Sequence, residues 1–117
     1  MADRITIYQK PSCTTCREVH AALTAAGVDF TAVNYYLEPL SESKLSALVK
    51  KLGQPARSLF RTKEAVHAEL NLGSREVPDD EAIRLMVKHP DLLQRPIVEK
   101  GDRAILARPS ERLSEIL

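Results

Sequence analysis

Residues 5–16 read ITIYQKPSCTTC, and this stretch decides the fold because it joins a strand pattern to the start of a helix. Ile5-Thr6-Ile7-Tyr8 is a short β-branched and aromatic run with alternating apolar positions, which is typical of a strand. Lys10-Pro11-Ser12 interrupts the run, and Cys13-Thr14-Thr15-Cys16 follows it directly. Both cysteines of the chain lie in this motif, so the stretch predicts a strand that leads straight into a cysteine pair.

A helix is predicted to begin at the cysteine motif. Apolar residues spaced at i, i+3, i+4 and i+7 give it one buried stripe, formed by Val19, Ala22, Leu23 and Ala26. Gly27 follows where a left-handed C-terminal cap would fall. Cys13 is therefore expected at the helix N-terminus, where unpaired N–H groups and the positive end of the helix dipole stabilise an anion.

This position predicts a reactive thiol. A free cysteine has a pKa of about 8.5, and helix N-termini and C-x-x-C motifs lower that value to roughly 3.5–7.5. We therefore expect Cys13 to be a nucleophile at neutral pH. Cys16, one helical turn further in, is expected to serve as a resolving thiol or redox partner.

Two other interpretations of the cysteine pair are less favoured. Zinc needs four ligands, and the only further candidates are three scattered histidines and acidic residues, although His20 would lie on the same helix as Cys16. A purely structural pair is poorly placed, because two thiols at one strand-to-helix junction cannot link distant parts of the chain. No metal site is therefore predicted.

Length and composition favour one small cytoplasmic domain. The 117 residues, 44% of them hydrophobic, are predicted to form a single domain over residues 1–117. The net charge of +1 gives no basic field for direct nucleic-acid binding. The sequence has no signal-peptide pattern and no apolar run that predicts a membrane span. In the cytosol, a cysteine pair is usually reduced and reactive.

The rest of the chain predicts a helical insert between two parts of one sheet. Residues 29–35 read as a second strand, parallel to the first. After Pro39, Ser41 is predicted to cap a helix that ends at Gly53. Two or three short helices should follow before residue 90, with Thr62 and Asp79 as candidate N-caps. The insert is placed at about 39–93.

Strand patterns return near the C-terminus. Residues 97–100 and 103–106 are predicted to pair across the Gly101-Asp102 turn, and Ser110 is predicted to begin a short terminal helix. The predicted class is therefore α/β, with a mixed four-stranded sheet and a helical insert between the second and third strands.

This order, with C-x-x-C after the first strand, resembles the thioredoxin fold and its glutaredoxin branch. Four further segments narrow the resemblance: Pro11-Ser12-Cys13, Leu59-Phe60-Arg61, Arg95-Pro96-Ile97-Val98 and Arg108-Pro109-Ser110-Glu111. Together they make the whole chain similar to the glutaredoxin-coupled arsenate reductases, a family that also includes the Spx regulators.

The resemblance implies an oxyanion site. It assigns attack on arsenate to Cys13 and oxyanion binding to Arg61, Arg95 and Arg108. Arsenate resembles phosphate in charge and acceptor oxygens, which planar guanidinium groups match. Pro96 corresponds to the cis-proline that faces the cysteine motif in thioredoxin-like proteins.

The implied activity is thiol-dependent reduction of arsenate to arsenite, in arsenic detoxification. Cys13 would attack arsenic, the arginines would neutralise the developing charge, and a second thiol would release arsenite. In the family, glutathione supplies that thiol as co-substrate and glutaredoxin clears the mixed disulfide. No bound cofactor is implied.

Two departures from the family pattern leave details open. Cys16 replaces a serine of well-known members, so a Cys13–Cys16 disulfide could form and thioredoxin could replace glutathione. Gln9-Lys10 replaces the His-Asn pair, so a histidine thought to assist the thiolate is missing and Lys10 could supply positive charge.

Two alternative functions also stay open. The C-x-x-C matches Spx, in which the cysteine pair is a redox switch and the protein binds the RNA polymerase α subunit. Against this, the Arg108-Pro109-Ser110-Glu111 motif is absent from Spx-type chains. The third hypothesis is a general thiol-disulfide oxidoreductase.

Overall fold

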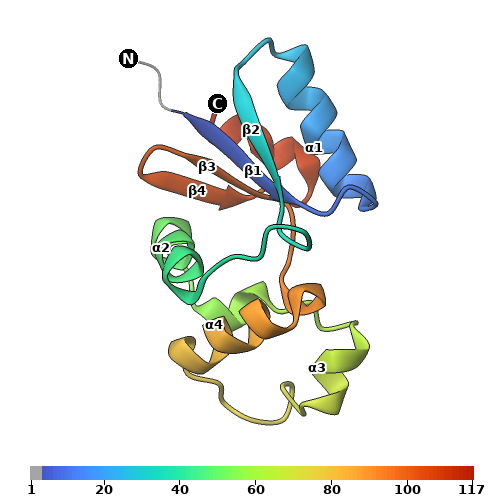
Figure 1. Cartoon of the computed structure of the whole chain (residues 1–117), viewed down its shortest axis with the longest axis vertical. Helices are drawn as coiled ribbons and strands as arrows, with labels where there is room; N and C mark the ends of the chain where they lie inside the picture. The colour runs from blue at the N-terminus through green and yellow to red at the C-terminus, as the bar shows by residue number, and fades with distance from the viewer. Residues whose placement is uncertain (1–3) are drawn as a thin grey trace. The chain divides into compact units, whose positions relative to one another are not determined.

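The computed structural model, which describes residues 4–117, contains a four-stranded mixed sheet (Figure 1). Its strands lie in the order β2-β1-β3-β4. β1 and β2 are parallel, whereas β1 pairs with β3, and β3 with β4, in antiparallel register. The strands are β1 (Ile5–Gln9), β2 (Phe30–Asn34), β3 (Ile97–Lys100) and β4 (Arg103–Leu106). The predicted mixed α/β sheet is confirmed.

Two helical segments, α1 (Thr14–Ala25) and the 3₁₀ segment η3 (Ser110–Glu115), share one hydrophobic core with the sheet. Side chains alternate along a strand, so Ile5 and Ile7 of β1 share a face and enter the same core. Fully burying one such side chain stabilises the fold by about 1.5–3 kcal/mol. The core residues are Ile5, Ile7, Val19, Leu23, Val98, Ala107, Leu113 and Ile116.

The β3–β4 hairpin turns at the residues predicted from the sequence. Lys100 pairs with Arg103, which leaves Gly101 and Asp102 as the two-residue turn. Gly101 has φ of +60°, in the left-handed region that a two-residue hairpin turn requires. The turn residue therefore fits the short connection between the strands.

The chain divides into two compact units. One comprises the residues up to Glu38 together with Arg95–Leu117, and holds the sheet, α1 and η3. The other, Pro39–Gln94, is helical and lies between β2 and β3 in the sequence. The proposal of one domain with an insert at about 39–93 stays a prediction.

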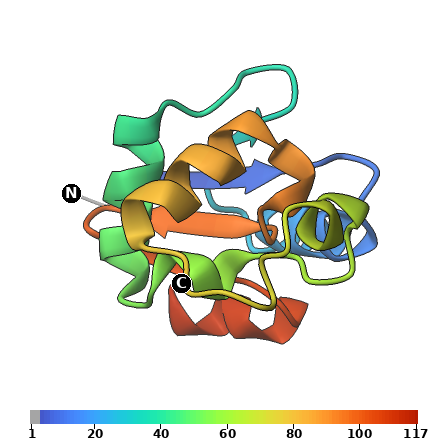
Figure 2. The ribbon, with the colours of Figure 1, turned by 90° about the horizontal axis from the view of Figure 1, so that it is seen from below.

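Within the helical unit, α2 and α4 lie against one another (Figure 2). Buried Leu45, Leu48 and Val49 form the apolar face of α2, while Ala82, Ile83 and Met86 form that of α4. The segments of this unit are α2 (Glu42–Leu52), η1 (Ala56–Leu59), α3 (Ala65–Glu69), α4 (Asp79–Lys88) and η2 (Pro90–Leu92).

Two predicted helix caps in this unit are wrong. Helix α3 begins after Glu64 rather than at Thr62. Asp79 is the first residue of α4, after Pro78, and its carboxylate instead accepts a hydrogen bond from the backbone N–H of Ala56, at 3.0 Å. A long-range partner therefore replaces the local capping bond at Asp79.

No helix formed by residues 4–117 has the length and apolar character needed to cross a membrane.

The Ser41 cap of α2 gives a test of local stability. Ser41 Oγ accepts a hydrogen bond from the N–H of Lys44 at 3.0 Å. Ser41→Ala should lower the free energy of unfolding in urea by about 1 kcal/mol, because it leaves that N–H without its capping partner. Ser43, an exposed residue within α2, provides the control. Ser43→Ala should leave stability unchanged or slightly raised, because alanine favours helix. Equal stability of the two variants would contradict a role for the cap.

Candidate active site at the start of helix α1

Cys13 is the N-cap residue of α1, as the sequence predicts for a thiol at a helix N-terminus. Its backbone is extended, and its Sγ accepts a hydrogen bond from the backbone N–H of Cys16 at 3.4 Å. The N–H of Cys13 donates to the carbonyl oxygen of Lys10 at 2.9 Å. This turn places the sulfur at the end of the helix where unpaired N–H groups collect.

The surroundings of Cys13 favour its thiolate. Burial raises its pKa, but hydrogen bonds from the backbone and side chain of Cys16 and from the side chains of Arg95 and Arg108 lower the pKa more, to about 7. A larger share of Cys13 is therefore ionised at neutral pH than of a free cysteine. The structure thus supports the expected nucleophile.

Cys16 has the opposite environment. Its side chain is completely buried. Burial raises the pKa of the Cys16 thiol to about 12, and the neighbouring Cys13 adds to this rise. Both cysteines are free thiols, so at neutral pH Cys16 is a protonated donor beside the Cys13 sulfur.

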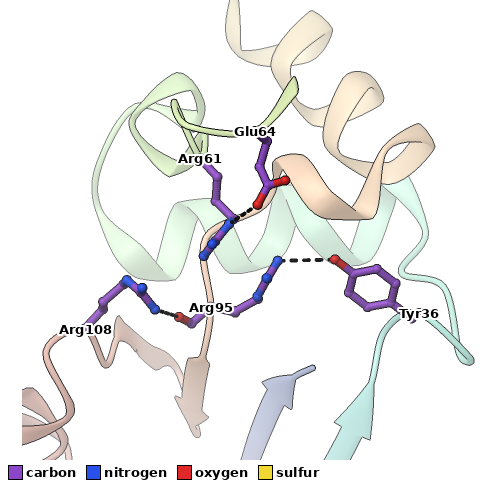
Figure 3. Close-up of polar contacts among 5 residues, drawn as sticks. All are labelled: Tyr36, Arg61, Glu64, Arg95 and Arg108. Carbon is purple, nitrogen blue, oxygen red and sulfur yellow. Dashed lines mark hydrogen bonds and ion pairs between the residues drawn. The ribbon is translucent and has the colours of Figure 1, made fainter. Parts of the chain in front are cut away.

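Arg95 and Arg108 come together at this site (Figure 3). Arg108 donates from Nη1 to the backbone carbonyl oxygen of Arg95, at 3.1 Å. Arg95 is only 6% exposed, and its Nε has no hydrogen-bond partner among the described residues. A buried guanidinium with an unused donor is suited to receive an anion, because an unpaired buried donor is costly.

The two arginines share a second feature. The Arg95–Pro96 peptide bond is cis, which confirms the conformation implied for Pro96. The Arg108–Pro109 bond is also cis, a conformation that was not predicted from the sequence.

Arg61 belongs to the helical unit, between η1 and α3. Its Nε donates to the Glu64 carboxylate at 3.0 Å, so this guanidinium has a carboxylate partner within its own unit (Figure 3). The predicted part of Arg61 in oxyanion binding remains a prediction.

Lys10 lies beside an aromatic ring. Its ammonium group is 4.8 Å from the centre of the Tyr36 ring, a cation–π contact. The groups that lower the pKa of Cys13 are Cys16, Arg95 and Arg108, and Lys10 is not among them. Its proposed support of the thiolate therefore stays a prediction.

Sequence reasoning missed Tyr36. Arg95 Nη1 donates to the hydroxyl oxygen of Tyr36 at 3.2 Å (Figure 3). The sequence signal was available, because Tyr36 directly follows the end of the second predicted strand. The sequence did not indicate that Arg95, 59 positions later, lies at the same end of the sheet as Tyr36.

Residues 4–117 contain no group of three or more His, Cys, Asp and Glu side chains placed to hold a metal ion. His20, the histidine considered as a zinc ligand, packs edge-on against Phe30 with ring centres 5.1 Å apart.

The two thiols should react differently with iodoacetamide. In the folded protein, alkylation of Cys13 should titrate with a midpoint near pH 7, well below the value of about 8.5 for a free cysteine. Cys13→Ser should leave little alkylation at neutral pH, because Cys16 is buried and protonated. Mass spectrometry would locate the label. A midpoint near the free-cysteine value, or preferential labelling of Cys16, would contradict this description.

Comparisons with known proteins extend the resemblance. The ArsC family model matches residues 8–116. Among curated relatives, an arsenate reductase of Rhizobium meliloti is 37% identical, over 97% of this chain and 81% of its own. The Escherichia coli protein YfgD, described as uncharacterized, is 36% identical over 100% of this chain and 99% of its own.

Solved structures agree with the sequence relatives. An arsenate reductase from Vibrio cholerae superposes with a TM-score of 0.92 at 36% identity, covering 100% of both chains. A putative arsenate reductase from Yersinia pestis gives a TM-score of 0.88 at 38% identity, covering 96% of this chain and 99% of its own. With the family match spanning nearly the whole sequence and a thioredoxin-like sheet beneath the cysteine motif, the chain belongs to the ArsC family.

Proposed function

We propose that this protein reduces arsenate to arsenite, with Cys13 as the nucleophile. The observation that carries the proposal is the meeting of two arginine side chains with a thiol whose pKa is lowered to about 7. Relatives named arsenate reductase, in Rhizobium meliloti and Escherichia coli, support the same activity.

The site suits an oxyanion of the size and charge of arsenate. Arg95 and Arg108 supply two guanidinium groups, and neither forms an ion pair with a carboxylate in the described part of the chain. Guanidinium groups bind tetrahedral oxyanions through paired N–H donors. Arg61 is proposed as a third ligand, on the family resemblance alone.

The proposed reaction consumes two thiols. The Cys13 thiolate attacks As(V), an S–As bond forms, and one As–O bond breaks with loss of water after protonation. A second thiolate then attacks the Cys13 sulfur, so that an S–S bond forms and the S–As bond breaks. The electron pair of that bond stays on arsenic, which leaves as As(III) arsenite. Two thiols are oxidised to a disulfide and arsenic gains two electrons.

The arginines should act most strongly during attack. Negative charge builds on the arsenate oxygens as the fifth bond to arsenic forms, and donors already aimed at those oxygens need no reorganisation. The Cys16 N–H and S–H stabilise the Cys13 thiolate before attack. The described residues therefore provide both the nucleophile and charge stabilisation.

For the second thiol we propose glutathione, with glutaredoxin resolving the mixed disulfide. The support is the burial of Cys16 and its pKa of about 12, which leave it protonated at neutral pH. Thiolate, not thiol, attacks sulfur. The cytoplasm, where glutathione is reduced, is the proposed location.

The activity is tested by arsenite formation from arsenate with glutathione and glutaredoxin. The wild type should turn over and Cys13→Ser should not. Absence of arsenite with this system and with thioredoxin would reject the proposal. Arsenite should be quantified directly, so that unrelated thiol oxidation is not counted.

The arginines provide a graded test. Arg95→Ala should lower kcat/KM for arsenate by roughly 10- to 100-fold, because a hydrogen bond to a charged group contributes about 1.5–3 kcal/mol. Arg112→Ala is the matched control, because Arg112 pairs with Glu115 on η3 and lies partly exposed. That variant should retain wild-type kinetics. Equal effects of the two substitutions would remove Arg95 from the site.

The reductant is tested with Cys16→Ser. Under glutathione and glutaredoxin this variant should keep turning over, at a reduced rate because serine changes the donor beside Cys13. Trapping the reaction with iodoacetamide should give Cys13 joined to glutathione. Complete loss of turnover, with a Cys13–Cys16 disulfide accumulating in the wild type, would instead identify Cys16 as the second thiol.

A further inference from the structure

The hydrogen bond between Tyr36 and Arg95 joins two strands that are not neighbours. Tyr36 lies two residues after the end of β2, and Arg95 lies two residues before β3. In the sheet, β1 lies between those strands, and the loop after β1 carries Cys13. Figure 3 shows the bond spanning the end of β1. It therefore crosses the sheet at the edge from which the reactive cysteine emerges.

Tyr36 is itself fixed by its neighbours. Its backbone N–H donates to Asn34 Oδ1 at 3.0 Å, which holds the turn after β2. The centre of its ring lies 5.1 Å from the centre of the Tyr35 ring. The Lys10 ammonium nitrogen lies 4.8 Å from the centre of the Tyr36 ring. Because these contacts fix the Tyr36 ring, its hydroxyl oxygen is held in position to accept a hydrogen bond from the Arg95 guanidinium.

The hydrogen bond to Tyr36 restricts the conformations of the Arg95 side chain. An arginine side chain has several rotatable bonds, and ordering it on ligand binding costs conformational entropy. The bond from Nη1 to Tyr36 orders the side chain before an anion arrives and leaves Nε without a partner among the described residues. Burial lowers the pKa of the Arg95 guanidinium. Its interactions with Tyr35, Tyr36 and Cys13 outweigh that effect and raise the pKa overall.

We propose that Tyr36 is a positioning residue that holds the Arg95 guanidinium in place for both Cys13 and the bound oxyanion. This inference deepens the proposed arsenate reduction and rests on it where substrate binding is concerned. Tyr36 acts through Arg95 and not on the reacting atoms. The contact with Cys13 can be followed without any substrate.

The variant Tyr36→Phe tests this role, because it keeps the ring and removes only the hydroxyl. The alkylation midpoint of Cys13 should move upward, since Arg95 would spend less time beside the sulfur. The KM for arsenate should rise about fivefold, the change expected from the net loss of one hydrogen bond. The kcat should change less, because Arg95 still reaches the bound substrate.

A double-mutant cycle with Arg95→Ala separates positioning from a general effect. In the Arg95→Ala background, Tyr36→Phe should cause no further change in either the alkylation midpoint or KM. Additive effects in the double variant would overturn the proposal. An unchanged midpoint and KM in Tyr36→Phe alone would overturn it as well.

Tyr8→Phe is the control for losing a tyrosine hydroxyl elsewhere. Tyr8 donates to the Glu99 carboxylate at 2.7 Å within the buried part of the sheet. This variant should be less stable, yet its Cys13 midpoint should match that of the wild type. If Tyr8→Phe shifts the midpoint as far as Tyr36→Phe does, the effect reflects stability and the positioning role is rejected.

The alkylation measurement is independent of the substrate. If the wild type forms no arsenite but Tyr36→Phe and Arg95→Ala remain coupled in the Cys13 midpoint, the proposed function fails and the positioning of Arg95 by Tyr36 stands. If arsenite is formed and the coupling is absent, the proposed function stands and the positioning of Arg95 by Tyr36 is rejected.

Discussion

Stabilisation of negative charge on the Cys13 sulfur is the interaction around which this structure is organised. Helix α1 supplies the Cys16 N–H, and the segment before β3 supplies Arg95. Arg108, after β4, and the Cys16 thiol supply further donors. These groups come from three parts of the sequence and require the sheet to bring them together. Together they outweigh the burial that would otherwise keep the thiol protonated.

The sheet order explains how this convergence arises. The parallel β1–β2 pair and the antiparallel β1–β3 pair place β1 between the strands associated with Tyr36 and Arg95. The loop after β1 turns directly into α1, so the helix N-terminus lies at the same edge of the sheet. A helix dipole, two guanidinium groups and a tyrosine hydroxyl therefore act on one small region.

Local sequence signals predicted much of this fold, and long-range contacts account for what they missed. The strand at 97–100, the strand at 103–106 and the Ser41 cap depend on adjacent residues, and the structure confirms them. The prediction of Asp79 as an N-cap is wrong because its carboxylate accepts a hydrogen bond from the N–H of Ala56, 23 positions away. At the site, the position of Cys13 followed from local pattern alone. Arg95 and Arg108 needed the family resemblance, and Tyr36 escaped notice because its bond to Arg95 depends on strand order.

Arg61 and Arg95 illustrate two ways of using a guanidinium. Arg61 has a carboxylate partner in Glu64, whereas Arg95 has none among the described residues, and its side chain donates to the Tyr36 hydroxyl and to the Cys13 sulfur. Phosphate has the same shape and charge as arsenate, so the proposed oxyanion site should bind both anions. Thiols reduce arsenic(V) and leave phosphorus(V) unchanged. For the proposed reaction, selectivity for arsenate over phosphate then comes from the reactivity of the central atom and not from binding. Phosphate, which does not react, should act as a competitive inhibitor at the same site.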